Sequence, residues 1–287
     1  MEGLLTYWYL LPISIIIATI AMSSGIGGAV FFSPLFLLLL ALEPAVAIGA
    51  ALITEFFGFS SGVYAYSKAR LIDYKLGINL LLFSIPPAII GSLVADYFDP
   101  DILKTIFASG IIFIGWQLFA AYRQEEKEKN DQSIKMEFQE NFESSLTDRG
   151  GNVYRYTVCN KPMGRFFALV GGFFLGMISV GLAELQEYHL VGRCRVPSRV
   201  AVATSVFVVV ITVLVASVGH ITHFVTQADP SKLQTVFKVV IFTVPGVVLG
   251  GQLGPLLQKR INPDVMKISI SVLFVLIGLF LLGTLIF

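Results

Sequence analysis

Long apolar stretches separated by short polar segments dominate the pattern of this chain. A helix needs roughly 20 apolar residues to cross a bilayer. Two of the apolar stretches, 8–42 and 166–192, are too long for one crossing and short for two. Single helical crossings are predicted at 46–66, 76–95, 102–122, 201–223, 236–257 and 265–287.

Small residues interrupt each of the two longer stretches near its middle. The interruptions read "SSGIGGA" at 23–29 and "GMISVG" at 176–181. A length between one and two crossings, together with a glycine-rich interruption, predicts two shortened helices that meet inside the membrane. Such a break is tolerated where the backbone is buried in protein or lines a cavity. The alternative is close packing of unbroken helices through small residues.

Part of the sequence occurs twice. The segment "FSIPPAIIGSL" at 83–93 returns as "FTVPGVVLGGQL" at 242–253, and upstream Gly28 aligns with Gly181 in the same order. Such order is hard to produce by chance, so we interpret the chain as an internal duplication. The aligned pairs of the longer segment are Phe83 with Phe242, Pro86 with Pro245 and Gly91 with Gly250.

The composition is that of a protein surrounded by lipid. Hydrophobic residues make up 55% and charged residues only 14%, against a charged share of about a quarter in soluble domains. We therefore predict an all-α integral membrane protein with an inverted five-plus-five helix repeat and two short re-entrant or broken helix pairs. The predicted parts are a first membrane repeat at 1–122, a connector at 123–162 and a second membrane repeat at 163–287.

Basic residues gather in alternate loops and predict the orientation. The positive-inside rule places the connector in the cytosol and both termini outside the cell membrane. Five helical elements per copy is an odd number, so the second copy is inverted. The loops rich in Lys and Arg are 67–75, 123–165, 193–199 and 258–267, whereas the loops on the other side hold only Lys104, Lys232 and Lys238.

The connector is the only polar segment of any length. Its first part, "RQEEKEKNDQ", indicates a solvated helix extension or linker. Its second part alternates apolar and polar residues around 148–151, which predicts a small β-hairpin packed on the cytosolic face. Cys159 and Cys194 both fall on this reducing side, so we expect two free thiols rather than a disulfide.

Three acidic residues fall within the apolar stretches, where an ionised group is costly. Glu184 and Glu187 are three residues apart and share a helix face, and Glu55 lies in the middle of a predicted crossing. Each is a candidate for carrying a proton or holding a cation. The alternative is a structural ion pair of Glu184 or Glu187 with one of the nearby arginines, Arg193, Arg195 and Arg199.

Histidine gives little support for a metal site. His189 and Cys194 stand five residues apart, off a common α-helical face, whereas metal pairs on helices usually stand three or four apart. His220 and His223 have suitable spacing but no acidic residue or cysteine close in sequence. We predict interfacial histidines, no metal and no cofactor.

The glycine breaks are the stronger candidates for a binding site. A helix that begins within the membrane directs unpaired backbone N–H groups and its positive end into the cavity, which suits an oxyanion. Hydroxyl groups of "ATS" at 203–205 add donors, and no nucleotide-binding or enzymatic motif is present, so no enzyme is predicted. The predicted binding residues are Ser23, Ser24, Gly25, Gly27, Gly28, Ser179, Gly181, Thr204, Ser205 and Arg193.

Two motifs resemble those of the TauE/SafE family of membrane proteins, also called sulfite exporters. "SGIGGAVFFSPLF" at 24–36 is similar to the glycine-rich first motif of that family, and "AVATSV" at 201–206 to its second. In two places the chain departs from the family pattern. The second glycine motif is replaced by "SVGLAELQEYHL", which introduces Glu184 and Glu187, and the first copy has "AIGAAL" without hydroxyl groups.

The resemblance implies secondary transport of a sulfur-containing anion such as sulfite or an organosulfonate, as an exporter linked to protons. The expected partners are a small anionic solute, protons and the lipid bilayer. A homodimer is compatible with the sequence, and no nucleic-acid partner is indicated. Two alternatives stay open: a cation or metal transporter using Glu184, Glu187 and His189, and an intramembrane enzyme or assembly factor without a transport cycle.

Overall fold

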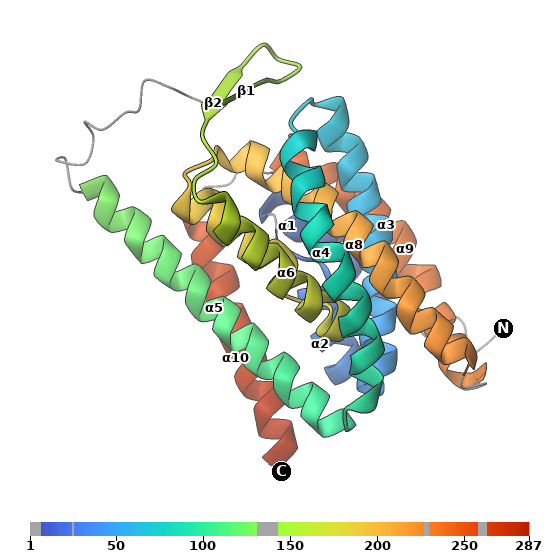
Figure 1. Ribbon diagram of the computed structural model, residues 1–287. Helices are drawn as coiled ribbons and strands as arrows, with labels where there is room; N and C mark the ends of the chain where they lie inside the picture. The colour runs from blue at the N-terminus through green and yellow to red at the C-terminus, as the bar shows by residue number, and fades with distance from the viewer. Residues whose placement is uncertain (1–6, 25, 131–142, 227–229, 258–262, 287) are drawn as a thin grey trace.

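The computed structural model describes residues 7–24, 26–130, 143–226, 230–257 and 263–286 as a helical bundle with one two-stranded sheet at one end (Figure 1). Apolar side chains cover the outside of several helices, as expected where the neighbour is lipid. The expected all-α membrane protein is therefore confirmed. Within the described residues, the helices long and apolar enough to cross a membrane are Pro44–Lys68, Tyr74–Val94, Pro100–Ala120, Ser198–Thr222 and Lys232–Leu257.

The elements follow one another in the order that the hydrophobic pattern predicts. The first half holds α1 Leu10–Ser24, α2 Ala29–Leu38, α3 Pro44–Lys68, α4 Tyr74–Val94, a 3-10 turn Ala95–Tyr97 and α5 Pro100–Asn130. The hairpin strands are β1 Ser144–Thr147 and β2 Val153–Tyr156. The second half holds α6 Lys161–Ile178, α7 Leu182–Glu187, a π-helix Tyr188–Arg193, α8 Ser198–Thr226, α9 Pro230–Leu257 and α10 Pro263–Ile286.

Both predicted helix breaks are present. The first separates α1 from α2, and Gly28 precedes the first residue of α2. The second separates α6 from α7, where Ser179 and Gly181 have φ angles of 61° and 117°. Glycine adopts positive φ at little cost because it has no Cβ. The two broken helix pairs expected from the length of the apolar stretches are confirmed.

Helices of the first half pack against helices of the second half. In the structure α1 packs on α9, α6 packs on α4, and α5 runs beside α10 (Figure 1). A side chain on Gly91 of α4 would collide with the backbone of Phe173 in α6, and one on Gly250 of α9 with the backbone of Ile15 in α1. The aligned glycines thus occupy corresponding places in reciprocal contacts, while the division into two repeats stays a prediction.

Two pairs of buried hydroxyl groups also join helices of different halves. Thr54 of α3 lies 2.8 Å from Thr243 of α9, oxygen to oxygen, and Ser84 of α4 lies 3.0 Å from Thr212 of α8. Ser84 and Thr243 are matching positions of the duplicated segment. Hydrogen bonds between membrane helices contribute on average about 0.6 kcal/mol each, so these pairs align neighbouring helices more than they hold the bundle together.

The expected β-hairpin is confirmed, and its turn is organised by Asp148. The carboxylate accepts hydrogen bonds from the backbone N–H groups of Gly150, at 2.8 Å, and Asn152, at 2.9 Å. The hydrogen bond from the Asn152 side chain is the largest of several that hold the pKa of Asp148 below its usual range, against a smaller opposing effect of desolvation. The turn is therefore stabilised by an ionised carboxylate.

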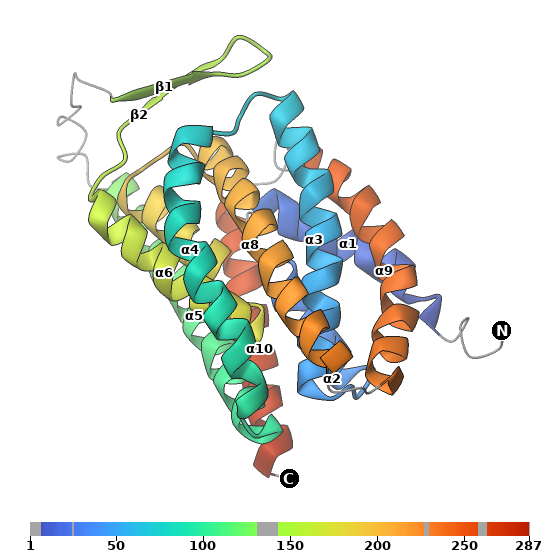
Figure 2. The ribbon, with the colours of Figure 1, turned by 45° about the vertical axis from the view of Figure 1, so that its right-hand side comes forward.

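The hairpin lies against the ends of the helices (Figure 2). The N–H of Arg149 donates to the carbonyl of Ala69 at 3.0 Å, and the hydroxyl of Tyr156 donates to Asp73 at 2.7 Å. The hairpin and the last turns of α10 lie at opposite ends of the molecule (Figure 1). Which end faces the cytosol stays a prediction from the basic loops.

One expectation about the connector is wrong. Cys159, which follows the hairpin, and Cys194, which follows the π-helix, form a disulfide with their Cα atoms 5.0 Å apart. The sequence predicted two free thiols because their side of the membrane is expected to be reducing. The redox state of a compartment does not determine which side chains lie in contact, and the fold brings these two together.

Candidate functional site at the two helix breaks

Glu184 joins the two helix breaks. Its side chain leaves the first turn of α7, and the carboxylate accepts hydrogen bonds from the N–H of Gly27 at 2.9 Å and of Gly181 at 3.0 Å. Gly27 belongs to the first break and Gly181 to the second. Only 2% of Glu184 is exposed. The backbone donors expected to bind an oxyanion are therefore occupied by a carboxyl group of the protein itself.

A second carboxylate, that of Glu55 in α3, approaches the same point. A Cβ added to Gly27 would lie 3.1 Å from an oxygen of Glu55 and 3.2 Å from an oxygen of Glu184. Glu55 is 2% exposed, and neither of its oxygens has a well-formed hydrogen bond within the described residues. The two acids therefore converge on one glycine from different halves of the chain.

Backbone N–H groups are the polar neighbours of these two acids. Within the described residues no salt bridge of Glu55 or Glu184 is found, and the ion pairs there join Lys161 with Glu143, Arg199 with Asp148 and Lys232 with Glu43. The N–H groups of the first break face Glu55, and those of both breaks face Glu184. Such donors suit anions and carboxylates alike, so the site can hold a negative charge without Lys or Arg.

A hydroxyl pair gives a further contact between the two breaks. Ser33 of α2 and Ser179 lie 2.7 Å apart, oxygen to oxygen, and both are buried. Ser179 was predicted from the sequence, whereas Ser33 was missed. Its signal was a single polar residue in the apolar run "FFSPLF" at 31–36.

The other predicted serines of the first break serve their own helix. The hydroxyls of Ser23 and Ser24 both donate to the carbonyl of Ile20, at 2.8 and 3.0 Å. Gly25 lies outside the described residues, and Gly28 is buried beside Glu55.

Two further predicted residues, Thr204 and Arg193, are not gathered at the breaks. Thr204 accepts a hydrogen bond from the N–H of Asp73 at 3.0 Å and so supports the start of α4. Arg193 is exposed at the end of the π-helix. Ser205 is buried, and its hydroxyl has no hydrogen-bond partner within the described residues.

The alternatives raised for the acids can be compared with the contacts. Glu184 is held by backbone N–H groups and not by an arginine, while Arg199 contacts the hydroxyl of Tyr154 at 2.8 Å. Glu187 is also buried on α7. Beside it Gln186, which the sequence analysis missed, buries an amide whose oxygen and nitrogen have no partner within the described residues. Its signal was a third polar residue in "AELQE" at 183–187.

The histidines differ from expectation. His220 is not interfacial: it is buried, and its Nε2 lies 2.9 Å from the carbonyl oxygen of Gly176. The side chain of His223 lies outside the described residues. In the described part of the chain, acidic, histidine and cysteine side chains gather in threes only at Cys159, His189 and Cys194. The metal-transport alternative, which needs both acids of α7 beside His189, therefore gains no support.

The fold and the site together define a multi-pass membrane protein with a polar centre buried between two interrupted helices. The chain matches the family model "Sulfite exporter TauE/SafE" over residues 10–281, and it belongs to that family. The expected family is thus confirmed.

Curated relatives extend along almost the whole chain. It is 25% identical over 281 residues to the probable membrane transporter protein YunE of Bacillus subtilis, covering 96% of each chain. It is 22% identical over 292 residues to a probable membrane transporter protein of Methanocaldococcus jannaschii, covering 98% of this chain and 97% of the relative. It is also 23% identical to the probable membrane transporter protein YdhB of Bacillus subtilis, over 90% of this chain and 93% of that one. No solved structure matches the chain.

Proposed function

We propose that this membrane transporter is a secondary active exporter of a small sulfur-containing anion, sulfite or an organosulfonate, coupled to protons. The observation that carries the proposal is the carboxylate of Glu184 held by the N–H groups of Gly27 and Gly181. A site that binds a carboxylate through backbone donors has the chemistry to bind another oxyanion. The family description supports sulfite as the first solute to test.

Glu184 and the solute compete for the same donors in this mechanism. While its carboxylate is ionised it fills the N–H groups of both breaks and repels a second anion. A proton on Glu184 removes the negative charge and weakens its hydrogen bonds to the amides. The solute then binds in its place, so that proton and anion occupy the site together. Sulfite carried with one proton still has a net negative charge, so an inside-negative membrane potential drives its export.

Glu55 gives the site a second place for a proton. It faces Gly27 from α3 and lacks a well-formed hydrogen bond within the described residues. Two like charges close together in apolar surroundings oppose each other's ionisation. A proton that leaves Glu184 therefore has an acceptor nearby, and Glu187 on the same helix as Glu184 is the third candidate.

Transport by the purified protein in liposomes is the direct test. We expect labelled sulfite, thiosulfate, taurine, sulfoacetate and small carboxylates to be taken up to different extents, with a sulfur oxyanion preferred. Liposomes that contain the chain but show no flux of any of these anions would refute the function. Flux of a metal ion, with no response to sulfonates, would instead establish the metal-transport alternative.

Coupling needs a second measurement on the same vesicles. An imposed pH gradient should drive anion uptake by the unmodified protein, and Glu184→Gln should retain anion exchange while losing the response to the gradient. Glu55→Gln and Glu187→Gln identify which other acid takes part. A stable Glu184→Gln protein with full gradient-driven uptake would remove Glu184 from the coupling mechanism.

A further inference from the structure

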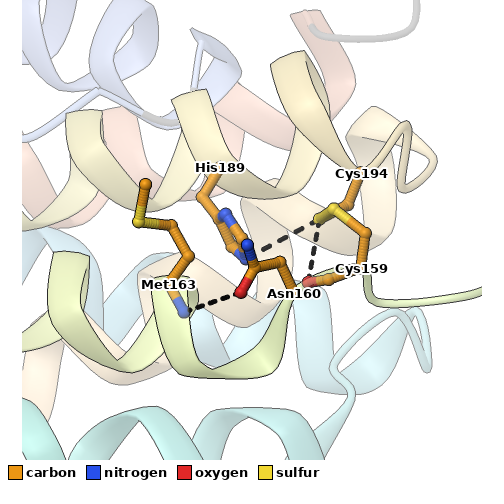
Figure 3. The surroundings of a disulfide bond; sticks show 5 residues. All are labelled: Cys159, Asn160, Met163, His189 and Cys194. Atoms are coloured by element: carbon orange, nitrogen blue, oxygen red, sulfur yellow. Dashed lines mark hydrogen bonds between the residues drawn. A yellow bond between two sulfur atoms is a disulfide. The ribbon is translucent and has the colours of Figure 1, made fainter.

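Cys159, Cys194 and His189 form a compact cluster at the end of the second broken helix pair. The sulfur of Cys194 lies 3.6 Å from Nε2 of His189 (Figure 3). One potential ligand atom from each of the three residues lies within 4.8 Å of the other two. The proposed transport mechanism uses Glu184, Gly27 and Gly181 and does not use this cluster.

The π-helix Tyr188–Arg193 brings His189 and Cys194 together. In an α-helix residues five apart point in different directions, whereas a π-helix bonds each residue to the fifth one along. The N–H of Cys194 donates to the carbonyl of His189 at 3.0 Å, which is such a bond. A spacing of five residues disfavours a metal pair on an α-helix. On this π-helix the same spacing brings His189 and Cys194 together.

The surroundings of His189 direct its ring toward the two sulfurs. The ring is 2% exposed and lies against Phe167, with centroids 5.7 Å apart. A Cβ on Gly164 would come within 2.8 Å of Nε2, so the glycine of α6 leaves the space that the ring occupies. Nδ1 is buried with no hydrogen-bond partner within the described residues.

We propose that Cys159, Cys194 and His189 bind a Zn²⁺ ion when the disulfide is reduced. Two thiolates and one imidazole nitrogen are a ligand set that zinc prefers, and three protein ligands leave the fourth position to water or another ligand. Reduction by a dithiol transfers two electrons and two protons to the disulfide, and the dithiol becomes a disulfide itself. Zinc binding then displaces the two thiol protons.

The position of Cys159 permits the change from disulfide to metal site. Zinc needs each sulfur about 2.3 Å from the ion, so the two sulfurs must move apart. Cys159 precedes Asn160, whose side chain accepts the N–H of Met163 at 3.2 Å to begin α6 (Figure 3). The cysteine thus lies outside the helix and can shift without breaking it. On the predicted cytosolic side, thiols are the expected form.

Both the disulfide and the proposed zinc site join the connector to the helical segment that begins with α7. Cys159 lies three residues after β2, and Cys194 follows directly on the π-helix that continues α7. Zinc or a disulfide therefore ties the hairpin to the segment that carries Glu184. The proposed zinc site does not depend on which solute the protein transports.

Metal binding to the full chain in detergent tests the proposal. The protein is reduced with dithiothreitol, freed of it without air, and titrated with Co²⁺, which gives a sulfur-to-metal absorption band when bound by thiolates. We expect one Co²⁺ per reduced chain, displaced by Zn²⁺, and none in the oxidised chain. Cys159→Ser and Cys194→Ser should each abolish the band, and His189→Gln should weaken binding at least about tenfold.

Controls separate loss of ligands from loss of folding. His220→Gln changes a buried histidine of α8 whose Nε2 lies 2.9 Å from the carbonyl oxygen of Gly176, and it should bind Co²⁺ like the unmodified protein. Gel filtration and thermal unfolding report folding for every variant. A folded, reduced chain that binds no Co²⁺ would refute the site. The same conclusion follows if the cysteine variants bind normally, if His189→Gln binds as tightly as the unmodified protein, or if the disulfide is reduced only on unfolding.

Discussion

Replacing Glu184 by glutamine should make the protein bind its anion more tightly. The carboxylate now accepts two backbone hydrogen bonds, from Gly27 at 2.9 Å and from Gly181 at 3.0 Å. The carboxamide oxygen of glutamine can keep one of them, while its NH₂ group cannot accept the other. One backbone donor is thereby released to the solute, and the negative charge that repels the solute disappears.

The size of the effect follows from the hydrogen bond that is lost. A hydrogen bond to a charged group contributes about 1.5–3 kcal/mol, and about 1.4 kcal/mol changes an equilibrium constant tenfold. Removing this competition should therefore increase anion affinity about tenfold to a hundredfold. The unfilled N–H of the variant without anion should lower its stability by about 1–3 kcal/mol, and saturating anion should restore it.

The assay is equilibrium binding of labelled sulfite to the purified protein over a range of pH. For the unmodified protein affinity should rise as the pH falls, because protonation withdraws Glu184 from competition. For Glu184→Gln it should be high at every pH. Glu187→Gln, on the same helix, should keep the pH dependence. Weaker binding by Glu184→Gln, with stability and fold retained, would refute competition between the carboxylate and the solute.

Three further predictions concern other parts of the molecule. Gly27→Ala should impair transport more than Gly28→Ala in membrane-inserted protein, and leucine at either position should abolish it. The reason is that a Cβ on Gly27 meets two carboxylate oxygens within 3.2 Å, whereas one on Gly28 meets none within 3.7 Å. Equal flux from both alanine variants would contradict this prediction. A cysteine introduced within 224–232 should react with an impermeant reagent from outside, and Cys159 only after permeabilisation and reduction; opposite labelling would overturn the orientation. Asp148 has a lowered pKa, chiefly through the hydrogen bond from the Asn152 side chain, so its contribution to hairpin stability should be complete above the unfolded value of about 3.9 and be lost as the pH falls through the folded pKa. Asp148→Asn should therefore speed hydrogen exchange of the hairpin at neutral pH, and unchanged exchange would contradict the role of the carboxylate.

The framework of the molecule could be predicted because its causes are local. The length of apolar runs sets the number of residues that can span a bilayer, and glycine-rich interruptions marked both broken helix pairs. The alternation of residues around 148–151 was sufficient for the hairpin. Gly91 and Gly250, matched by sequence alone, occupy corresponding close contacts in the fold.

The details of the site could not be predicted because they depend on contacts between distant segments. The sequence identified Glu184, Gly27 and Gly181 as candidates, but it assigned the glycines to the solute and the acid to protons. Only the fold shows the acid bonded to both glycines. The proximity of His189 and Cys194 was missed for a different reason: the spacing argument assumed an α-helix where the chain forms a π-helix.

The two halves of the chain are alike in framework and different in chemistry. Thr54 and Thr212 make matching hydroxyl pairs, yet the residue after Thr54 is Glu55 whereas the residue after Thr212 is Val213. Glu184 likewise comes only from the second half. Each half thus supplies one of the two carboxylates at Gly27, and neither half could form the pair alone. The predicted duplication would account for the two helix breaks. The acids are placed asymmetrically and lie within reach of the same backbone donors, which the proposed competition between carboxylate and anion requires.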